Sequence, residues 1–391
     1  MDILTFTTLF PNRAHPTNGI FVETRLRHLV ASGKVRSRVV APVPWFPFRH
    51  ARFGRYAKFA QAPRADRRFG YDIVHPRYPV VPKLGMTAAP FLLANAVKPV
   101  IGRIIDEGYD FDVIDAHYFY PDGVAAAMLG RYFNKPVVIT ARGTDISFIP
   151  QYRLPRKMIR WAVDHADCAI AVCDALRQEL IALGADAGRV VTLRNGVDLQ
   201  LFRPVDRDQA RRELQLEHFT LLSVGNLVSH KGHDLVIGAL TELPDVRLLI
   251  AGAGPEQATL KALAERLGVS DRVRFLGTLP QERLKACYGA ADALVLASSR
   301  EGWANVLLES MACGTPVVAS KVWGTPEVVA SPAAGILMEE RSARGVAQSV
   351  AALRACYPDR AATRRYAEQF SWDATTRGQI DVFRRLRRKR P

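Results

Sequence analysis

Cysteines are few in this sequence, and no pattern pairs them. Five occur among 391 residues, and no two of them are spaced as CxxC. An odd count without that spacing argues against a disulfide framework and against a cysteine-ligated zinc site. We therefore expect buried free thiols in a reducing compartment.

Long hydrophobic runs are also missing. The longest nearly uncharged run covers residues 84–97, between Lys83 and Lys98. It is shorter than the ~20 apolar residues that cross a bilayer, so we expect a buried helix there. Residues 1–9 form a strand-like segment without a basic start, so we expect no secretory signal and a cytoplasmic protein.

Several motifs of common enzyme and binding classes do not occur. The sequence has no GxxxxGK[ST] phosphate loop, no HExxH and no GxSxG, and Gly252-Ala253-Gly254 lacks the third glycine of a dinucleotide fingerprint. It also has no helix-turn-helix, zinc-finger or RNA-recognition motif. We therefore expect no resident metal, no cofactor and no nucleic-acid partner.

The chain is strongly basic, with a formal net charge of +16. Residues 1–200 carry 27 Lys and Arg against 17 Asp and Glu, and the remainder carries 27 against 21. This excess predicts an anionic partner, which is a nucleic acid, a phospholipid or a phosphorylated substrate. The hydrophobic fraction of 48% is that of an ordinary soluble globular protein.

Apolar strand-like segments alternate with amphipathic helical segments along most of the chain. Strands are predicted at residues 3–6, 38–41, 113–116, 137–140, 168–172, 190–193, 220–224, 247–251, 273–276, 293–296 and 317–319. Helices are predicted at residues 21–31, 123–132, 175–183, 257–267 and 306–313. This alternation predicts an α/β fold with parallel sheets covered on both faces.

The alternation is interrupted once, from the turn at Asn195-Gly196 to residue 218. We therefore expect two doubly wound domains, at residues 1–200 and 201–370, and a C-terminal basic helix at 371–391 that crosses back to the first domain. Ligands of such folds bind at the carboxyl ends of strands, so the predicted site is the cleft between the domains.

Two basic segments stand out as candidate membrane contacts. Residues 50–59 are predicted to form an amphipathic surface with aromatic side chains. Its cations, with the residue just before it, are Arg49, Arg52, Arg55 and Lys58, and its aromatics are Phe53, Tyr56 and Phe59. The tail at 384–390 has six basic residues in seven, and it is either a solvated helix end or a second membrane contact.

The stretch from Glu301 to Pro316 carries the strongest chemical signal. A predicted strand leads through a loop into a helix, whose N-terminus offers free N–H groups and a positive dipole end for an anion such as phosphate. Glu301 precedes this terminus and Glu309 lies two turns inside. The two carboxylates suit hydroxyl groups on either side of a bound diphosphate. The alternative is a solvated Glu301 and a Glu309 on the helix surface.

With its Glu-x7-Glu spacing and Cys-Gly-Thr-Pro turn, this stretch resembles the signature of retaining glycosyltransferases of family four. Further motifs extend the resemblance over nearly the whole chain: Thr17-Asn18-Gly19, Asn195–Asp198, Val224–Leu227, Lys231-Gly232, Ala251–Pro255, Val273–Gly277 and Gly324–Glu327. Residues 140–150 are similar to a subgroup of teichuronic-acid and exopolysaccharide transferases. The family implies the GT-B fold, in which two Rossmann-like domains face across a cleft.

The resemblance implies roles for residues of the second half. Glu309 would bind the donor ribose hydroxyls and Glu301 would face the donor sugar. Lys231 would compensate diphosphate charge. The backbone that receives the distal phosphate would be that of Gly302, Trp303, Ala304 and Asn305. Trp303 either packs in the core or lines the sugar pocket.

In the first half, the resemblance implies that Gly19 packs near the diphosphate and that His117 contacts the transferred sugar. Two residues depart from the family pattern. Asn226 stands where an Arg is usual, and Arg142 stands where many members have His. Arg142 would supply the missing charge or hold an acceptor phosphate. The alternatives are an ordinary surface cation for Lys231 and Arg142, a structural histidine for His117 and a turn for Gly19.

The implied activity is transfer of a sugar from a UDP- or GDP-sugar to an anionic, lipid-linked saccharide for a cell-surface polymer. The family expectation is front-face displacement without a metal, by an enzyme peripheral on the inner face of the plasma membrane. Two alternatives stay open. One is a sugar-nucleotide epimerase of the same fold, and the other is a nucleic-acid-binding protein, which the net charge alone supports.

Overall fold

The computed structural model describes residues 1–46, 48, 50, 52, 55–80 and 85–388. The chain divides into two compact units, which we describe separately. Unit 1 comprises Met1–Arg194 and Asp373–Pro391, and unit 2 comprises Asn195–Trp372. The expected domain limits were residues 200 and 370, and the expected C-terminal segment falls with unit 1.

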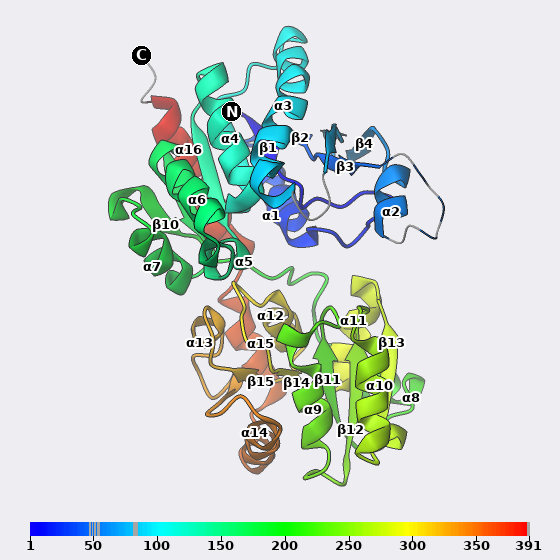
Figure 1. The fold of residues 1–391 in the computed structure, drawn as a ribbon. Coiled ribbons are helices and arrows are strands. Elements are labelled where there is room, and N and C mark those ends of the chain that lie inside the picture. The colour runs from blue at the N-terminus through cyan, green and yellow to red at the C-terminus, as the bar shows by residue number, and fades with distance from the viewer. Residues whose placement is uncertain (47, 49, 51, 53–54, 81–84, 389–391) are drawn as a thin grey trace. The chain divides into compact units, whose positions relative to one another are not determined.

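Unit 1 is built on an eight-stranded sheet in the order β10-β9-β8-β7-β1-β2-β5-β4 (Figure 1). Its strands are β1 Asp2–Phe6, β2 Arg36–Val40, β4 Ala65–Arg68, β5 Tyr71–Val74, β7 Val113–His117, β8 Val137–Ala141, β9 Cys168–Ala171 and β10 Val190–Thr192. All neighbours pair in parallel except β4 and β5, which are antiparallel. β3 Val43–Trp45 and β6 Arg77–Pro79 form a separate parallel pair.

Helices cover both faces of this sheet. They are α1 Ile20–Ala31, α2 Arg55–Gln61, α3 Gly85–Asp106, α4 Val124–Phe133, α5 Thr144–Ser147, α6 Arg153–His165, α7 Asp174–Ala182 and α16 Trp372–Arg388, with short turns η2 Phe119–Gly123, η3 Ile149–Gln151 and η4 Ala187–Arg189. Apolar side chains of α1 and α16 share one core with the sheet. The red helix α16 lies among the blue and green elements of unit 1 in Figure 1.

The helix expected at residues 84–97 continues through Lys98 to Asp106 as α3. Within the described ranges, Met86–Asp106 is a helix that by length and composition alone could cross a membrane. Leu93 and Val97 are fully buried, whereas Met86 and Phe91 are about half exposed. The expectation of a buried helix is therefore right for one side of α3 and wrong for the other.

Unit 2 is built on a parallel six-stranded sheet in the order β13-β12-β11-β14-β15-β16. Its strands are β11 Phe219–Val224, β12 Val246–Ala251, β13 Val273–Gly277, β14 Ala293–Leu296, β15 Val317–Ser320 and β16 Gly335–Met338. Its helices are α8 Arg207–Glu213, α9 His233–Ala239, α10 Gln257–Arg266, α11 Gln281–Ala290, α12 Asn305–Ala312, α13 Thr325–Val328, α14 Ala343–Ala355 and α15 Arg360–Glu368, with turns η5 Ser229–Lys231 and η6 Ser270–Arg272.

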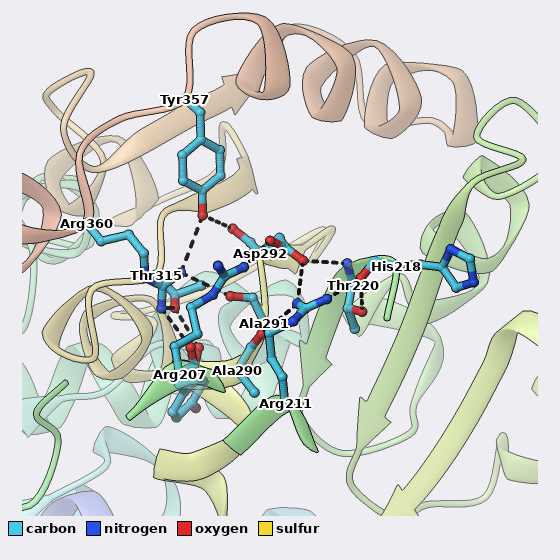
Figure 2. A network of polar contacts seen from close by, with 12 residues as sticks. Arg207, Arg211, His218, Thr220, Ala290, Ala291, Asp292, Thr315, Tyr357 and Arg360 are labelled. Carbon is cyan, nitrogen blue, oxygen red and sulfur yellow. Dashed lines mark hydrogen bonds and ion pairs between the residues drawn. The ribbon is translucent and has the colours of Figure 1, made fainter. Parts of the chain in front are cut away.

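Asp292, at the amino end of β14, ties α8 to the unit 2 sheet (Figure 2). Its carboxylate accepts hydrogen bonds from Arg207 at 2.5 Å, Arg211 at 3.1 Å and the Thr220 backbone at 2.7 Å. Its carbonyl accepts the Tyr357 hydroxyl at 2.6 Å. The hydrogen-bonding capacity of this buried carboxylate is therefore satisfied. The network holds the amino ends of β11 and β14, at the end of the sheet opposite the strand carboxyl ends.

All five cysteines are free thiols, as the sequence predicts. Four are buried, and burial raises the pKa of Cys168, Cys287 and Cys313. Cys356, after the end of α14, is exposed, so the expectation of buried thiols is wrong at that position.

Candidate functional site

The candidate anion site of unit 2 is the N-terminus of α12. The loop after β14 ends at Ala304, and no side chain caps the helix. Within the described ranges, no protein acceptor bonds the backbone N–H groups of Gly302, Trp303 and Ala304. Uncapped N–H groups and the helix dipole together favour an anion at this position.

A lysine–glutamate pair accompanies this terminus. Lys231 Nζ lies 2.5 Å from Glu301 Oε1, and Ser298 donates its hydroxyl to the same oxygen at 2.7 Å. The side chains of Lys231 and Glu301 are 22% and 11% exposed. An ammonium that is partly open to solvent can exchange one anionic partner for another, such as a phosphate.

Lys231 reaches Glu301 because the backbone at Gly232 packs closely against the backbone at Ala297. Gly232 follows it with a φ of 71°, and a Cβ there would lie 2.0 Å from the Ala297 carbonyl oxygen. Only glycine fits, because both the left-handed conformation and the contact exclude a side chain. The turn after η5 therefore packs directly on the carboxyl end of β14.

A buried histidine, which the sequence analysis missed, fixes the loop after β11. His233 Nε2 lies 3.3 Å from the Asn226 carbonyl oxygen, and Nδ1 lies 2.9 Å from the Ser223 hydroxyl. A carbonyl only accepts, so Nε2 carries the proton and Nδ1 accepts from Ser223. Burial lowers the pKa of His233, which keeps the ring neutral. Asn226 is thus held through its backbone.

Glu309 lies on the first turns of α12 and meets a fully buried tyrosine. Tyr288 of α11 donates its hydroxyl to Glu309 Oε2 at 2.8 Å. Burial raises the pKa of the Glu309 carboxyl to about 7, and the Tyr288 hydrogen bond opposes this rise. Glu309 is thus partly buried with a protein partner, and the alternative of a solvated Glu301 is wrong, because that side chain is 11% exposed and paired with Lys231.

Trp303 and Asn305 have structural partners. Trp303 is 6% exposed, and its ring centroid lies 6.1 Å from that of Phe370. Of the two roles considered for Trp303, the structure shows core packing. The Asn305 side-chain oxygen accepts from Asn195 Nδ2 at 3.2 Å. Both side chains are thereby held in place. The Asn305 backbone N–H donates to the Trp303 carbonyl at 3.1 Å, so in this conformation it is not open to the phosphate that the sequence analysis placed there.

In unit 1, His117 ends β7 inside a buried polar cluster. It is 1% exposed, and its Nε2 lies 3.4 Å from Asp115 Oδ2. Arg142, which follows β8, places Nη2 2.8 Å from His117 Nδ1. A guanidinium only donates, so Nδ1 accepts and Nε2 carries the proton toward Asp115.

Burial lowers the pKa of His117 to about 4, which Asp115 opposes and Arg142 reinforces. Arg142 itself is 9% exposed, and its guanidinium lies 5.4 Å from the Phe21 ring centroid. Both ring nitrogens of His117 thus have protein partners in this conformation. A contact from His117 to a sugar therefore requires one of these partners to move.

Three further buried groups support this cluster and were not predicted. Asp145 accepts backbone N–H bonds from Phe119 at 2.7 Å and from Gly143 at 2.7 Å. Arg25 of α1 is 1% exposed and donates to Gln379 of α16 at 2.9 Å. Asp122 accepts the Thr8 backbone N–H at 2.6 Å, and burial raises its pKa to about 7.

Gly19 stands directly before α1 with a φ of 67°. A Cβ at this position would lie 2.1 Å from the Leu9 carbonyl oxygen, so the turn after β1 admits no side chain. Asn18 donates to the Thr8 carbonyl at 3.1 Å and holds the same turn. The predicted glycine turn is therefore present, and its backbone is packed against the chain that leaves β1.

Part of the predicted membrane segment lies outside the described residues. This holds for Arg49, Phe53, and the side chains of Arg55 and Tyr56. Arg52 and Lys58 are exposed, and the last two basic residues of the tail, 389 and 390, also lie outside the description. Within the described ranges, no group of three or more His, Cys, Asp or Glu is arranged to hold a metal ion.

Two family models match consecutive parts of the chain. "Glycosyltransferase Family 4" matches residues 90–201 and "Glycosyl transferases group 1" matches residues 205–370. A D-inositol 3-phosphate glycosyltransferase from Mycobacterium marinum is 35% identical over 318 residues, which are 75% of this chain and 68% of that protein. The match thus spans about two thirds of that relative's length. Its name differs from the teichuronic-acid and exopolysaccharide subgroup that residues 140–150 resemble.

Solved structures agree on the fold. Sucrose-phosphate synthase from Thermosynechococcus elongatus has a TM-score of 0.81 at 21% identity, covering 98% of both chains. Anabaena HepE in complex with UDP-glucose has a TM-score of 0.71 at 21% identity, covering 97% of this chain and 98% of that one. The two doubly wound units, the family models and the relative lead to one conclusion: the chain belongs to the family-four glycosyltransferases and has their GT-B fold.

Proposed function

We propose that this glycosyltransferase moves a sugar, with retention of configuration, from a nucleotide-sugar donor to an anionic acceptor in the assembly of a cell-surface glycan. The observation that supports the donor site is the uncapped N-terminus of α12 beside Lys231 and Glu301. Three backbone N–H groups and one ammonium there suit the diphosphate of a sugar nucleotide. The HepE structure with UDP-glucose favours a UDP-sugar over a GDP-sugar.

Glu309 is proposed to accept hydrogen bonds from the donor ribose hydroxyls. Glu309 belongs to α12, the helix whose N-terminus is the proposed phosphate site, and Tyr288 donates a hydrogen bond to one of its carboxylate oxygens. With a pKa of about 7, the carboxyl binds hydroxyl donors best in its charged form. Glu301, whose Oε1 is held by Lys231 and Ser298, is proposed to face the donor sugar.

The proposed chemistry is front-face displacement. The acceptor hydroxyl oxygen forms the new bond to the anomeric carbon while the bond from that carbon to the diphosphate breaks. The hydroxyl proton moves to the departing phosphate oxygen. Lys231 and the N-terminus of α12 stabilise the negative charge on the leaving diphosphate by preorganised positive potential, so no metal is needed.

The acceptor is proposed to be a lipid-linked saccharide that carries an anionic group. The net charge of +16 supports an anionic partner, and the Mycobacterium marinum relative is named for an inositol phosphate acceptor. His117 is proposed to contact the transferred sugar, and Arg142 to meet an anionic group once it leaves His117. The enzyme is proposed to work in the cytoplasm, peripheral on the inner face of the plasma membrane, with Arg49, Arg52, Arg55 and Lys58 as cationic contacts.

A thermal-shift screen against UDP-, GDP- and ADP-sugars tests the donor proposal. A ligand present at 100 times its Kd stabilises the folded state by about 2.7 kcal/mol, so the true donor class should separate from the others. We expect the shift with UDP-sugars, in excess EDTA as well as with magnesium. No shift with any sugar nucleotide, or a shift that only magnesium permits, would contradict the proposed site.

A further inference from the structure

Helices α3, α4 and α6 lie side by side on one face of the unit 1 sheet (Figure 1). An open groove of about 350 Å³ runs between them. Its lining is apolar apart from Lys157, and includes Phe91 of α3, Met128 of α4, and Leu154 and Trp161 of α6. We refer to the outer side of these three helices as the helical face.

Exposed apolar side chains gather on the helical face. Among the described residues, ten large hydrophobic side chains are exposed, and five of these belong to α3, α4, α6 or the residue that precedes α6. They are Met86, Phe91, Tyr132, Tyr152 and Leu154, between 46% and 61% exposed. Phe91 and Leu154 also line the groove, and exposed apolar side chains around an apolar groove mark an interaction surface.

Cations border this patch, and carboxylates are missing from it. Helix α6 exposes Arg153, Arg156, Lys157 and Arg160 within its first turns. Its first carboxylate is Asp164. Helix α4 has no acidic residue, and α3 has none before its last residue. Apolar side chains beside an unbroken cationic rim complement an anionic lipid surface.

Helix α3 can contact a membrane surface while it stays packed against the rest of unit 1. Leu93, Val97 and Ile101 are fully buried in unit 1, whereas Phe91 on the same helix is 46% exposed. Moving α3 into a bilayer would expose the core that these three side chains fill. The helix therefore offers one apolar side to a partner while the other side stays packed on the protein.

We propose that the helical face docks on the anionic surface of a membrane. Phe91 and Leu154 enter the headgroup region, and the α6 cations meet lipid phosphates. This contact lies on a part of unit 1 that the sequence analysis did not assign, and it is distinct from the basic segment at residues 50–59. It rests on the proposed function in one respect, because a lipid-linked acceptor requires the enzyme at a membrane.

The test is co-sedimentation of the full chain with phosphatidylcholine vesicles, with and without phosphatidylglycerol, at low and high salt. We expect pelleting with the anionic vesicles that falls as salt rises. Each cation near such a surface contributes about fivefold to partitioning. Replacing Arg153, Arg156, Lys157 and Arg160 with Gln should therefore lower partitioning at least ~50-fold at low salt, since the four contributions overlap.

The matched control replaces four exposed cations of unit 2, Lys261, Arg266, Arg283 and Arg344, with Gln. It changes the net charge equally and should pellet like the unaltered chain. A second variant, Phe91→Ser with Leu154→Ser, should lose the part of the binding that survives high salt. Both side chains are half exposed, so this variant should fold.

Pelleting of the α6 variant at the level of the control would overturn the proposal. So would failure of the unaltered chain to pellet with any vesicle, in which case an acidic protein partner becomes the occupant to seek. Loss of binding on replacing Arg49, Arg52, Arg55 and Lys58, but not the α6 cations, would move the contact to residues 50–59. UDP affinity, measured by calorimetry for each variant, tests the donor site separately, since docking does not involve it.

Discussion

The candidate polar cluster of unit 1 and the candidate anion site of unit 2 differ in how completely their groups are satisfied by the protein. In unit 1, His117 is 1% exposed and both of its ring nitrogens have partners in Asp115 and Arg142. In unit 2, Lys231 is 22% exposed and three backbone N–H groups before α12 have no protein acceptor in the described ranges. Unit 2 therefore offers backbone N–H donors to an anion, while its Lys231, like His117 of unit 1, must exchange a protein partner before it can bind one.

The largest expected effect comes from Lys231→Gln, which removes the cation that pairs with Glu301 at the proposed phosphate site. Removing a preorganised donor to a leaving group lowers kcat by roughly 10²–10³-fold. We expect that loss with the donor identified by the thermal-shift screen, measured in steady state. Lys261→Gln, an exposed cation of the same unit, is the control and should keep full activity. Equal turnover of Lys231→Gln and the control would show that the ammonium is structural.

The next effect is on donor affinity. Glu309→Gln replaces a charged hydrogen-bond acceptor that is worth about 1.5–3 kcal/mol, so UDP affinity should fall roughly 10- to 100-fold while the fold survives. Calorimetry measures the affinity, and circular dichroism checks the fold. Unchanged UDP affinity would remove Glu309 from the donor site.

Glu309 also predicts a pH dependence of UDP binding. Its pKa is raised to about 7, so the charged form grows as pH rises from 6 to 8. UDP affinity should rise several-fold over this range in the unaltered chain, beyond the change from UDP's own ionisation. The Glu309→Gln variant reports that ionisation alone and should show a smaller rise. Parallel curves for the two proteins would contradict the assignment.

For unit 1, we expect His117→Ala to lower kcat far more than UDP affinity, because the proposed contact is to the reacting sugar. Arg142→Gln provides the matched variant, since it frees His117 Nδ1 from the guanidinium and leaves the imidazole in place. Wild-type kinetics for His117→Ala would show that the histidine is structural and that the cluster does not open during turnover.

A further expected effect is on stability in acid and does not involve a ligand. His117 has a pKa of about 4 in the fold and about 6.5 when unfolded, so the unfolded state binds more protons between these values. Its contribution, on the order of 2–3 kcal/mol, is present above pH 6.5 and is lost as pH falls toward 4. Asp122 and Glu309, with raised pKa values, act in the opposite direction. The difference between His117→Gln and the unaltered chain in urea unfolding, at pH 7 and pH 5, isolates the histidine.

The order of strands and helices could be predicted because most strands are continuous apolar runs between helical repeats. Strand β7, for example, is fully buried and was expected within one residue of its bounds. Strand β4 was missed because Ala65–Arg68 is a polar edge strand, which carries no apolar signal. Its antiparallel pairing with β5 departs from the expected parallel sheet.

The site could be predicted where its chemistry follows a local motif, and not where it depends on distant partners. Glu301 and Glu309 stand in one stretch, so their relation to the start of α12 follows from helix geometry. Tyr288 is a buried aromatic of a different helix, and nothing near it in sequence indicates that its hydroxyl meets Glu309. Likewise, the hydrogen bond from Arg25 to Gln379 joins residues 354 positions apart.

The return of α16 to unit 1 has a consequence for biosynthesis. Unit 2 is continuous from Asn195 to Trp372, so all of it has been synthesised before the last helix is made. The first segment of unit 1 is made before unit 2 but lacks the apolar side chains Ile380 and Phe383, and the partner of the buried Arg25, until α16 has been translated. Unit 1 thus starts before unit 2 and completes its core after it, and chaperones would need to protect it in the meantime.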